Sequence, residues 1–509
     1  MQKLLLGIDI GTSACKVAVF SEDGKVIVQN TGEYKLYYPN PGWVEQDPNE
    51  WWDATSTAIK EMFEKSNIQP NDIAGIGIDG QSWSAIPIDN KGEVLDKTPI
   101  WMDTRATDIC DELREKIGEE EIFALCGNPV QPTYTLPKIL WFKKHKPEMY
   151  KKIYKVLQSN SFIVYRLTGE ISQDLSQGYG LHCFDMKKGT WDDDMCVKMG
   201  LDINILPDKI YQCHKIVGTV NKKAAELTGL NIGTPVVAGG LDAACGTLGA
   251  GVINSGETQE QGGQAGGMSI CMDEYKAEKT LILGYHVVPD RWLLQGGTVG
   301  GGGVVRWFEK EFCELERARA KVNDTSSFDE MNIEAEKIEP GSDGLVFLPY
   351  MAGERSPIWD KNAKGVFYGL DFSKTRAHMI RSCFEGVAFS LKHNLDAALN
   401  AGAKVDALYA TGGSANSILW TQIKSDITGK KIIVPSSDTS TMMGAALLAG
   451  VGVGVYKDFK DAVIKTVKVT RNHEPDMEKH KKYKKFYDIY IALYNNLKGV
   501  MNKKWEDQK

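Results

Sequence analysis

Residues 4–13 of the chain read LLLGIDIGTS, and this stretch decides the fold. The apolar run over 4–10 predicts a buried strand, and the Gly-Thr-Ser that follows it predicts a tight turn. A second strand is predicted over 16–20. Asp23-Gly24 is then a strong hairpin signal before a third strand over 25–30. The chain therefore opens with three short strands.

Helices and further strands alternate after this opening. Residues 48–65 predict a helix with Asp47 as its N-cap, and residues 73–78 predict another strand. From about 103 to 233 the pattern is mixed and more helical, and it includes a helix from Thr135 with a proline in its first turn. Alternation at this pace favours an α/β architecture.

A weak internal repeat indicates a second domain. A predicted strand at 235–238 runs into GGLD at 239–242, and strand, glycine turn and strand follow again over 256–272. Later expected elements are a helix from about 304, a helix over 378–400, a strand over 408–411 and a helix over 417–428. We expect domains over 1–251 and 252–455, and an amphipathic helical tail over 456–509 packed on the body.

Composition excludes several classes of protein. The 509 residues are 42% hydrophobic and 25% charged, which is ordinary for a globular chain of two to four domains. The net charge of −7 gives no field that would attract nucleic acid or anionic lipid. No uncharged run reaches the roughly 20 residues of a membrane span. The ten scattered cysteines and the absence of a leader pattern lead us to expect a reducing cytoplasm.

Familiar catalytic motifs are absent or misplaced. GIGIDG at 75–80 matches the dinucleotide pattern, but two of its glycines lie inside the predicted strand rather than in the turn after it. GQSWS at 80–84 falls one residue short of the hydrolase elbow, and no P-loop occurs. The histidines are too widely spaced for most zinc sites.

Three glycine turns share one design, because each follows an apolar strand. They lie at 11–13, 262–267 and 412–414. Glycine lets backbone N–H groups approach an anion closely, and Thr12 and Ser13 add hydroxyl donors. Each turn alone is consistent with an ordinary tight turn, but all three together favour a polyphosphate ligand.

Three aspartates lie at positions suited to binding a polyphosphate and its metal ion or acceptor. Asp9 precedes the first glycine turn, where a carboxylate can hold a hydrated Mg²⁺ beside phosphates. Asp242 occupies the corresponding place after the strand at 235–238, although an Asx-turn or a helix N-cap explains either residue equally well. Asp103 has Arg105 nearby, and the simpler explanation of that pair is a surface ion pair worth little.

These motifs resemble the FGGY family of carbohydrate kinases. Residues 7–13 resemble the first phosphate motif of that family, and WVEQDP at 43–48 with Trp51-Trp52 is similar to the segment that follows it. Further sequence motifs of the family resemble four more segments of this chain, residues 133–145, 348–355, 365–385 and 411–420. The resemblance extends to about residue 455, and the most similar branch is that of the xylulokinases.

The resemblance implies two actin-like domains on RNase H-like cores, with ATP and a sugar in the cleft between them. It implies Mg²⁺ at Asp9, and closure of the cleft to keep water from the γ-phosphate. It gives Asp242 the role of the catalytic base. The nucleotide-binding residues that it implies are Asp9, Thr12, Ser13, Lys16, Gly262, Gly263, Gln264, Gly412, Gly413 and Asn416. The acceptor-binding residues that it implies are Gln81, Ser82, Trp83, Asp103 and Arg105.

The expected activity is ATP-dependent phosphorylation of the terminal hydroxyl of a small ketose, with D-xylulose as the first candidate. Two departures from the xylulokinase pattern leave alternatives open. GQSWS at 80–84 replaces the usual GQMHG, and GGQAG at 262–266 replaces the usual GTSG. Another ketose or a polyol therefore stays open as the acceptor, and Trp83 is either a pocket residue or a core aromatic. An actin-like ATPase module without a small acceptor is the alternative from another class, and a homodimer stays open.

Overall fold

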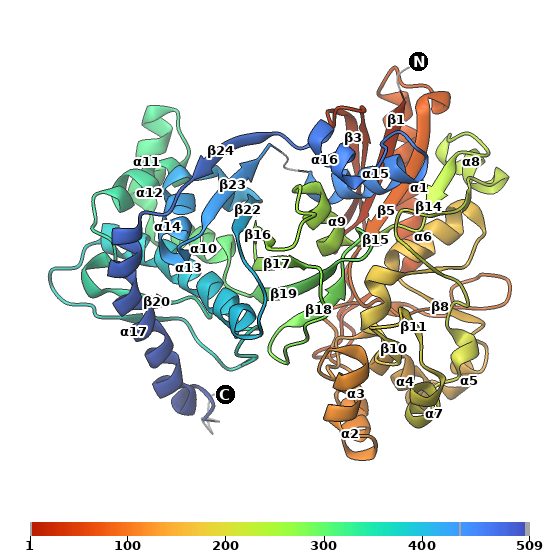
Figure 1. The fold of residues 1–509 in the computed structure, drawn as a ribbon, viewed down its shortest axis with the longest axis horizontal. Helices are drawn as coiled ribbons and strands as arrows, with labels where there is room; N and C mark the ends of the chain where they lie inside the picture. Colours follow the sequence, from red (N-terminus) through yellow and green to blue (C-terminus); the bar gives the residue numbers. More distant parts are fainter. Residues whose placement is uncertain (1–2, 437–438, 504–509) are drawn as a thin grey trace.

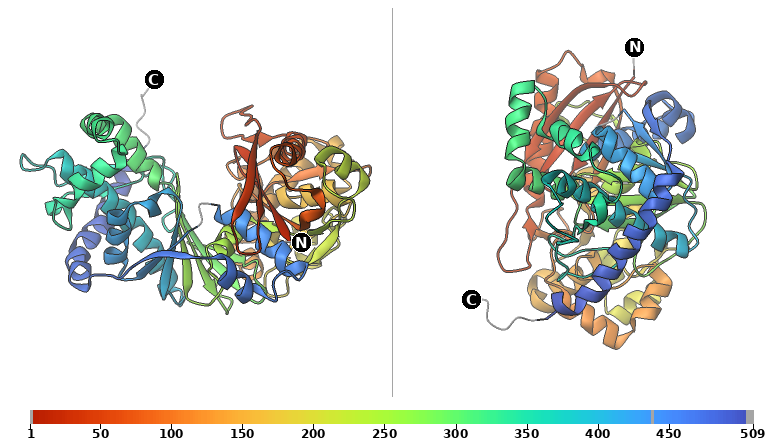
Figure 2. Two further views of the ribbon diagram at one scale, coloured as in Figure 1. Left: turned by 90° about the horizontal axis from the view of Figure 1, so that it is seen from above. Right: turned by 90° about the vertical axis from the view of Figure 1, so that its left-hand side faces the viewer.

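The computed structural model describes residues 3–436 and 439–503, and they form two lobes (Figure 1). Seen from above, the lobes make a V that is joined at its base (Figure 2, left). Each lobe is built on a seven-stranded mixed sheet with helices on its faces. The two-domain α/β architecture predicted from the sequence is confirmed.

The sheet of the first lobe has the order β13-β14-β5-β1-β2-β3, and β15 also pairs with β5. Its strands are β1 (Leu4–Ile10), β2 (Ala14–Phe20), β3 (Val26–Glu33), β5 (Ile73–Gly80), β13 (Ile216–Thr219), β14 (Pro235–Val237) and β15 (Gly240–Leu241). β1 and β2 are antiparallel and β3 continues the meander, whereas β5 lies parallel to β1 on its other side.

The sheet of the second lobe has the order β18-β19-β17-β16-β22-β23-β24. Its strands are β16 (Glu257–Gly262), β17 (Gly266–Met272), β18 (Ile282–Tyr285), β19 (Trp292–Thr298), β22 (Ala407–Thr411), β23 (Lys431–Pro435) and β24 (Val469–His473). The antiparallel strands β16, β17 and β19 and the parallel neighbour β22 repeat the pattern of β1, β2, β3 and β5. The internal repeat predicted from the glycine turns is therefore a repeat of topology.

Glycines in the central strands allow one helix to lie directly on the first sheet. α15 (Ser440–Gly452) crosses β1 and β5 there, and a Cβ at Gly7 would lie 2.2 Å from the carbonyl oxygen of Met442. A Cβ at Gly77 would lie 1.9 Å from the carbonyl oxygen of Ala445. The GIGIDG segment at 75–80 thus lies within β5, and its glycine at 77 lets α15 pack closely on the strand. The packing of α15 also differs from a simple second domain over 252–455, because this helix returns to the first lobe.

The remaining helices of the first lobe cover the opposite face of its sheet and fill a separate cluster below it (Figure 1). They are α1 (Pro48–Glu64), α2 (Thr107–Lys116), α3 (Glu119–Cys126), α4 (Thr135–His145), α5 (Pro147–Tyr150), α6 (Ser159–Thr168), α7 (Asp193–Met199) and α8 (Lys222–Thr228); α9 (Asp242–Gly249) packs with α15. Asp47 caps α1 as predicted, since its side chain accepts from the N–H of Asn49 at 2.9 Å. α4 begins at Thr135, as the sequence predicts.

The long α13 (Arg376–Asn400) of the second lobe packs against α10 (Gly302–Phe312), α12 (Ser327–Glu336) and α14 (Ile418–Thr428), and α11 (Glu314–Asn323) packs against α12. Five two-stranded pairs complete the fold: β4 (Glu45–Gln46) with β7 (Thr98–Pro99), β6 (Ile86–Ile88) with β8 (Lys155–Leu157), β9 (Gln173–Asp174) with β12 (Ile210–Tyr211), β10 (Phe184–Asp185) with β11 (Thr190–Trp191), and β20 (Val346–Leu348) with β21 (Val366–Tyr368).

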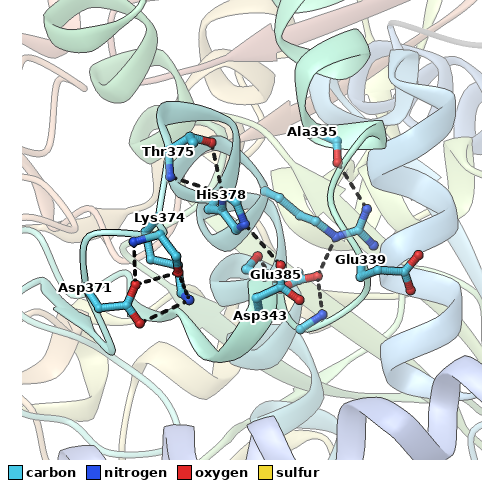
Figure 3. A network of polar contacts seen from close by, with 12 residues as sticks. Ala335, Glu339, Asp343, Asp371, Lys374, Thr375, His378 and Glu385 are labelled. Carbon is cyan, nitrogen blue, oxygen red and sulfur yellow. Dashed lines mark hydrogen bonds and ion pairs between the residues drawn. The ribbon is translucent and has the colours of Figure 1, made fainter.

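A buried carboxylate on α13 holds this lobe together (Figure 3). Glu385 accepts from the backbone N–H of Gly341 at 2.9 Å and from the hydroxyl of Ser342 at 2.9 Å. It also accepts from Arg381 Nε at 2.8 Å and from the hydroxyl of Tyr483 at 2.9 Å. These hydrogen bonds satisfy the buried carboxylate, and they connect α13 to the loop at 341–342 and to Tyr483.

The tail differs in part from the helix that we expected over 456–509. It contains α16 (Phe459–Thr466), then β24, and then α17 (Met477–Met501), whose tyrosines Tyr483 and Tyr490 are buried against the second lobe. The amphipathic helix is therefore present, but β24 adds an edge strand beside β23. In the described ranges, no helix has the length and apolar character needed to cross a membrane.

Candidate active site

A cavity of about 410 Å³ lies between the two lobes and is lined by both. The first lobe contributes Asp9, Gly11, Thr12, Ser82, Trp83, Trp101, Tyr179 and Asp242, and the second contributes Gln259, Gln261, Gly266, Ser269, Gln295 and Arg355. The first glycine turn, Asp242 and Trp83, which are far apart in the sequence, therefore meet at one site.

Three carboxyl groups gather on the first-lobe side of this cavity. Asp9 and Asp79 are register partners on the parallel strands β1 and β5. Asp242 begins α9 directly after β15, and β15 pairs with the end of β5. Asp79 is not among the residues predicted from the sequence, although Gly-Ile-Asp occurs at both 7–9 and 77–79.

Burial sets the protonation of these groups. It raises the pKa of Asp242 to about 7, the negative charge of Asp9 adds to this rise, and the N–H of Ala243, which donates at 2.6 Å, opposes it. Burial also raises the pKa of Asp9, against the pull of Lys16. The pKa of Asp79 lies well above its usual range because of burial and then of its two acidic neighbours. Asp242 can therefore take up or release a proton near neutral pH.

The carboxyls fit a hydrated Mg²⁺ that phosphate oxygens share. Within residues 3–436 and 439–503, no group of three or more His, Cys, Asp and Glu side chains is arranged to hold a metal. Mg²⁺ usually takes only one or two carboxylates and keeps several waters. Asp9 lines the cavity, and Asp79 lies beside it on β5. Asp9 is therefore the carboxylate that would hold such a cation beside the phosphates.

Trp83 is at once a wall of the cavity and part of the packed core. Its ring centroid lies 4.3 Å from that of Tyr134 and 6.0 Å from that of Tyr179, and its side chain is largely buried. Its backbone has a φ of 61°, in the left-handed region that few bulky residues adopt. The indole Nε1 has no hydrogen-bond partner in the part of the chain that the structure describes. Trp83 therefore offers one free donor beside the cavity.

A buried lysine holds the backbone on this wall. Lys138 Nζ donates to the carbonyl oxygen of Trp83 at 2.9 Å and to that of Ile100 at 2.7 Å. Ile100 precedes Trp101, which also lines the cavity and whose Nε1 donates to Thr12 Oγ1 at 3.0 Å. Burial lowers the pKa of Lys138 to about 7. The sequence analysis assigned neither Lys138 nor Trp101 to the site, because nothing local shows which carbonyls they meet.

Asp103 and Arg105 differ from expectation, because neither side chain lines the cavity. The guanidinium of Arg105 donates to Asp103 at 2.8 Å and pairs with Glu45 at 2.8 Å. Asp103 also accepts the N–H of Val44 at 2.6 Å. The two residues form a fully buried pair under the Trp43 ring, neither an acceptor contact nor a surface ion pair. We therefore remove both from the acceptor site.

Gln81 also points away from the acceptor. Its Nε2 donates to Gln46 Oε1 at 2.8 Å and to the carbonyl oxygen of Gly11 at 3.4 Å, and Gln46 in turn donates to the carbonyl oxygen of Thr12 at 2.8 Å. Gln81 thus supports the first glycine turn from behind. Ser13 and Lys16 are exposed and do not line the cavity either.

A second cavity, of about 350 Å³, lies in the second lobe. It is lined by the predicted Gly262, Gly263, Gln264, Gly413 and Asn416, together with Arg306, Phe384 and Trp420. Gly412 has a φ of 81°, and a Cβ there would lie 2.9 Å from the carbonyl oxygen of Gly262, so it joins the two turns. A Cβ at Gly413 would meet nothing within 4 Å and would enter open space.

One turn borders both cavities. Gly262 to Gln264 line the second cavity, while Ala265 and Gly266 line the cleft between the lobes. Two N–H groups at the start of α10 brace this turn: Gly302 donates to the carbonyl oxygen of Gly263 at 2.8 Å, and Gly303 to that of Gln264 at 2.9 Å. A ligand that occupies the second cavity can therefore reach the cleft past glycine backbone.

Two α/β lobes with glycine turns, and with carboxylates facing the cleft between them, define a phosphotransferase of the actin-like fold. The profile of the FGGY carbohydrate kinases matches residues 4–249 with its N-terminal domain and residues 268–453 with its C-terminal domain. The chain belongs to this family.

Relatives of known name are similar to this chain over nearly its whole length. The chain is 31% identical to a xylulose kinase of Bacillus subtilis over 98% of both chains. It is also 31% identical to a gluconokinase of Bacillus licheniformis, over 98% of this chain and 97% of that one. The solved structure of a xylulose kinase from Rhodospirillum rubrum superposes with a TM-score of 0.90 at 28% identity, and it covers 98% of this chain and 100% of its own.

Proposed function

We propose that this protein transfers the γ-phosphoryl group of ATP to the terminal hydroxyl of a small ketose, with D-xylulose as the first candidate. The observation that carries this proposal is the turn at 262–266, which borders both cavities. It supports a nucleotide in the second lobe whose phosphates enter the cleft where Asp242 lies. We further propose a cytoplasmic enzyme, and a homodimer remains a prediction.

Asp242 acts as the base in this proposal. Its carboxylate accepts the hydrogen bond of the acceptor hydroxyl, orients the oxygen and takes its proton as the new O–P bond forms and ADP leaves. The raised pKa supports this role, because a base poised near pH 7 is both ionised and able to accept a proton.

The nucleotide and its phosphates are held mainly by backbone. Gly262, Gly263 and Gly413 let N–H groups approach the ligand, and Asn416 borders the same cavity. On the first lobe, Thr12 and Asp9 face the cleft from the other side. Bound Mg²⁺ would neutralise charge on the phosphates, and Asp9 is the residue that we propose to hold it.

Trp83 and Ser82 form the acceptor side of the cleft in this proposal. A sugar offers apolar C–H faces and polar edges, and an indole can contact the former and donate one N–H to the latter. The names of the relatives support two acceptor classes, a ketose and an aldonate, and full-length identity to both is about equal. The ketose is favoured because xylulose kinases lead both the sequence and the structure comparisons.

A coupled ADP assay with the purified protein tests the proposal. Pentuloses, hexuloses, polyols and D-gluconate serve as acceptors, with Asp242→Asn as the inactive control. We expect D-xylulose to give the highest kcat/KM. ADP release that no acceptor changes would point to an ATPase module instead, and preference for D-gluconate would replace the ketose by an aldonate.

A further inference from the structure

Arg355 enters the cleft with its side-chain donors free. It follows β20 on a loop that is anchored to β19, because Ser356 Oγ accepts the N–H of Gly297 at 2.6 Å. In the described ranges, its guanidinium forms no ion pair and donates no hydrogen bond, and its Nε is buried without a partner. A buried donor without an acceptor is costly, so this guanidinium is available to bind a ligand that enters the cleft.

The neighbouring Glu354 does not form an ion pair with the Arg355 guanidinium. Glu354 Oε1 accepts the N–H of Val299 at 2.7 Å and the backbone N–H of Arg355 at 2.8 Å, so it fixes the loop rather than the guanidinium. Burial raises the pKa of Glu354 to about 7, which weakens it further as a counter-charge. Gly297 keeps the space open, because a Cβ there would lie 3.1 Å from an Arg355 terminal nitrogen.

The charges of the cleft point to an anionic ligand at this arginine. Among the described residues that line the cavity, Arg355 is the single lysine or arginine, and Asp9 and Asp242 line the same cavity from the first lobe. Its guanidinium carbon lies 5.9 Å from the centroid of the Trp101 ring, and Trp101 donates to Thr12. Arg355 therefore comes from the second lobe toward the first glycine turn.

We propose that Arg355 is a catalytic residue that binds oxygens of the transferred phosphoryl group and of the phosphate ester product. This inference rests on the proposed kinase function. A guanidinium presents a planar fork of N–H donors that matches two phosphate oxygens, and it stays charged when partly buried. Charge on the transferring phosphoryl group is what the enzyme must stabilise, and one such arginine typically changes kcat by about 10³-fold or more.

Arg355→Met and Arg355→Lys test the proposal, with Arg319→Met as the matched control. Arg319 is an exposed arginine on α11, paired with Glu334. In Arg355→Met we expect kcat on a neutral sugar to fall by about 10³-fold. The KM of the sugar and the Kd of ATP should change less than about threefold, since the interaction forms mainly during transfer. Millimolar guanidinium ion should restore part of the rate, and Arg355→Lys should retain part of it.

An equilibrium experiment separates this proposal from the proposed function. Calorimetry with inorganic phosphate in the presence of ADP needs no turnover, so it is informative even if no tested sugar is a substrate. We expect phosphate to bind about tenfold more weakly to Arg355→Met than to wild type and Arg319→Met. Equal phosphate affinity in all three proteins would overturn the proposal. So would a variant that loses only D-gluconate use while its kcat on neutral sugars is unchanged, because Arg355 would then bind an acceptor carboxylate.

Discussion

Asp242→Asn should lower activity and raise stability, because the environment that makes Asp242 a base also disfavours its charge in the folded protein. Burial and Asp9 raise its pKa from 3.8 to about 7. Between these values the unfolded chain releases the proton while the folded chain keeps it, so stability falls as pH rises. The loss is complete once the folded carboxyl ionises near pH 7.

The magnitude follows from the size of the pKa change. At 1.36 kcal/mol per unit, a rise from 3.8 to about 7 limits the effect to about 4 kcal/mol. Solvent in the open cleft screens a half-buried carboxylate. We therefore expect Asp242→Asn to be more stable than wild type by about 1–3 kcal/mol at pH 8, with the difference shrinking toward pH 4.

Activity should move in the opposite direction. The amide cannot take a proton, so kcat should fall by about 10²–10⁴-fold while ATP binding is kept. In wild type, kcat/KM should rise about tenfold between pH 6 and pH 8 as Asp242 ionises.

Urea denaturation of both proteins across this pH range, together with the coupled ADP assay, measures the two effects. Asp488→Asn, on an exposed stretch of α17, is the control that should change neither. Equal stabilities at every pH, or a flat wild-type profile from pH 6 to pH 8, would refute the reasoning.

Further predictions for four substitutions concern the walls of the two cavities. Trp83→Ala should raise the KM of the acceptor far more than the Kd of ATP, because the ring lines only the cleft; equal losses, or simple unfolding, would make Trp83 structural. Gly413→Val should keep the fold and weaken ATP binding, measured by fluorescence titration, because its side chain enters open cavity space. Gly412→Val should instead lower Tm, since its φ is 81°. Lys138→Met should lower stability by about 1–3 kcal/mol and raise the acceptor KM, because two buried carbonyls lose their donor, and unchanged acceptor kinetics would exclude this positioning role.

Local sequence signals predicted those helices and strands that depend only on residues close by in the sequence. The strand at 4–10, the cap at Asp47 and the helix from Thr135 all follow from neighbours within one or two turns of chain. The weak repeat of strand, glycine turn and strand also predicted a second domain, and the second sheet does repeat the strand pattern of the first. The return of α15 to the first lobe was not predictable in this way, because it depends on Gly7 and Gly77 meeting a helix more than 350 residues later.

The residues of the candidate site also differ in how well local sequence predicted their positions. Residues predicted from turns, such as Thr12, Gly263 and Gly413, do line the cavities, because a turn after a strand delivers its backbone to the edge of the sheet. Gln81, Asp103 and Arg105 do not, because Gln81 is hydrogen-bonded to Gln46, Asp103 accepts from Val44, and Arg105 forms an ion pair with Glu45. Nothing within a few residues of either segment indicates those partners.

The sequence by itself determined that this is a two-domain α/β protein with three glycine turns and an aspartate at the end of each of two strands. These features depend on periodicity and on backbone geometry, which act over a few residues. Only the tertiary structure decided that Asp79 lies beside Asp9, that Lys138 holds the Trp83 backbone, and that Arg355 reaches the cleft without a partner. The physical reason is that pairing register and burial, which set these contacts and the pKa of Asp242, come from residues far apart in the sequence that only the folded chain brings together.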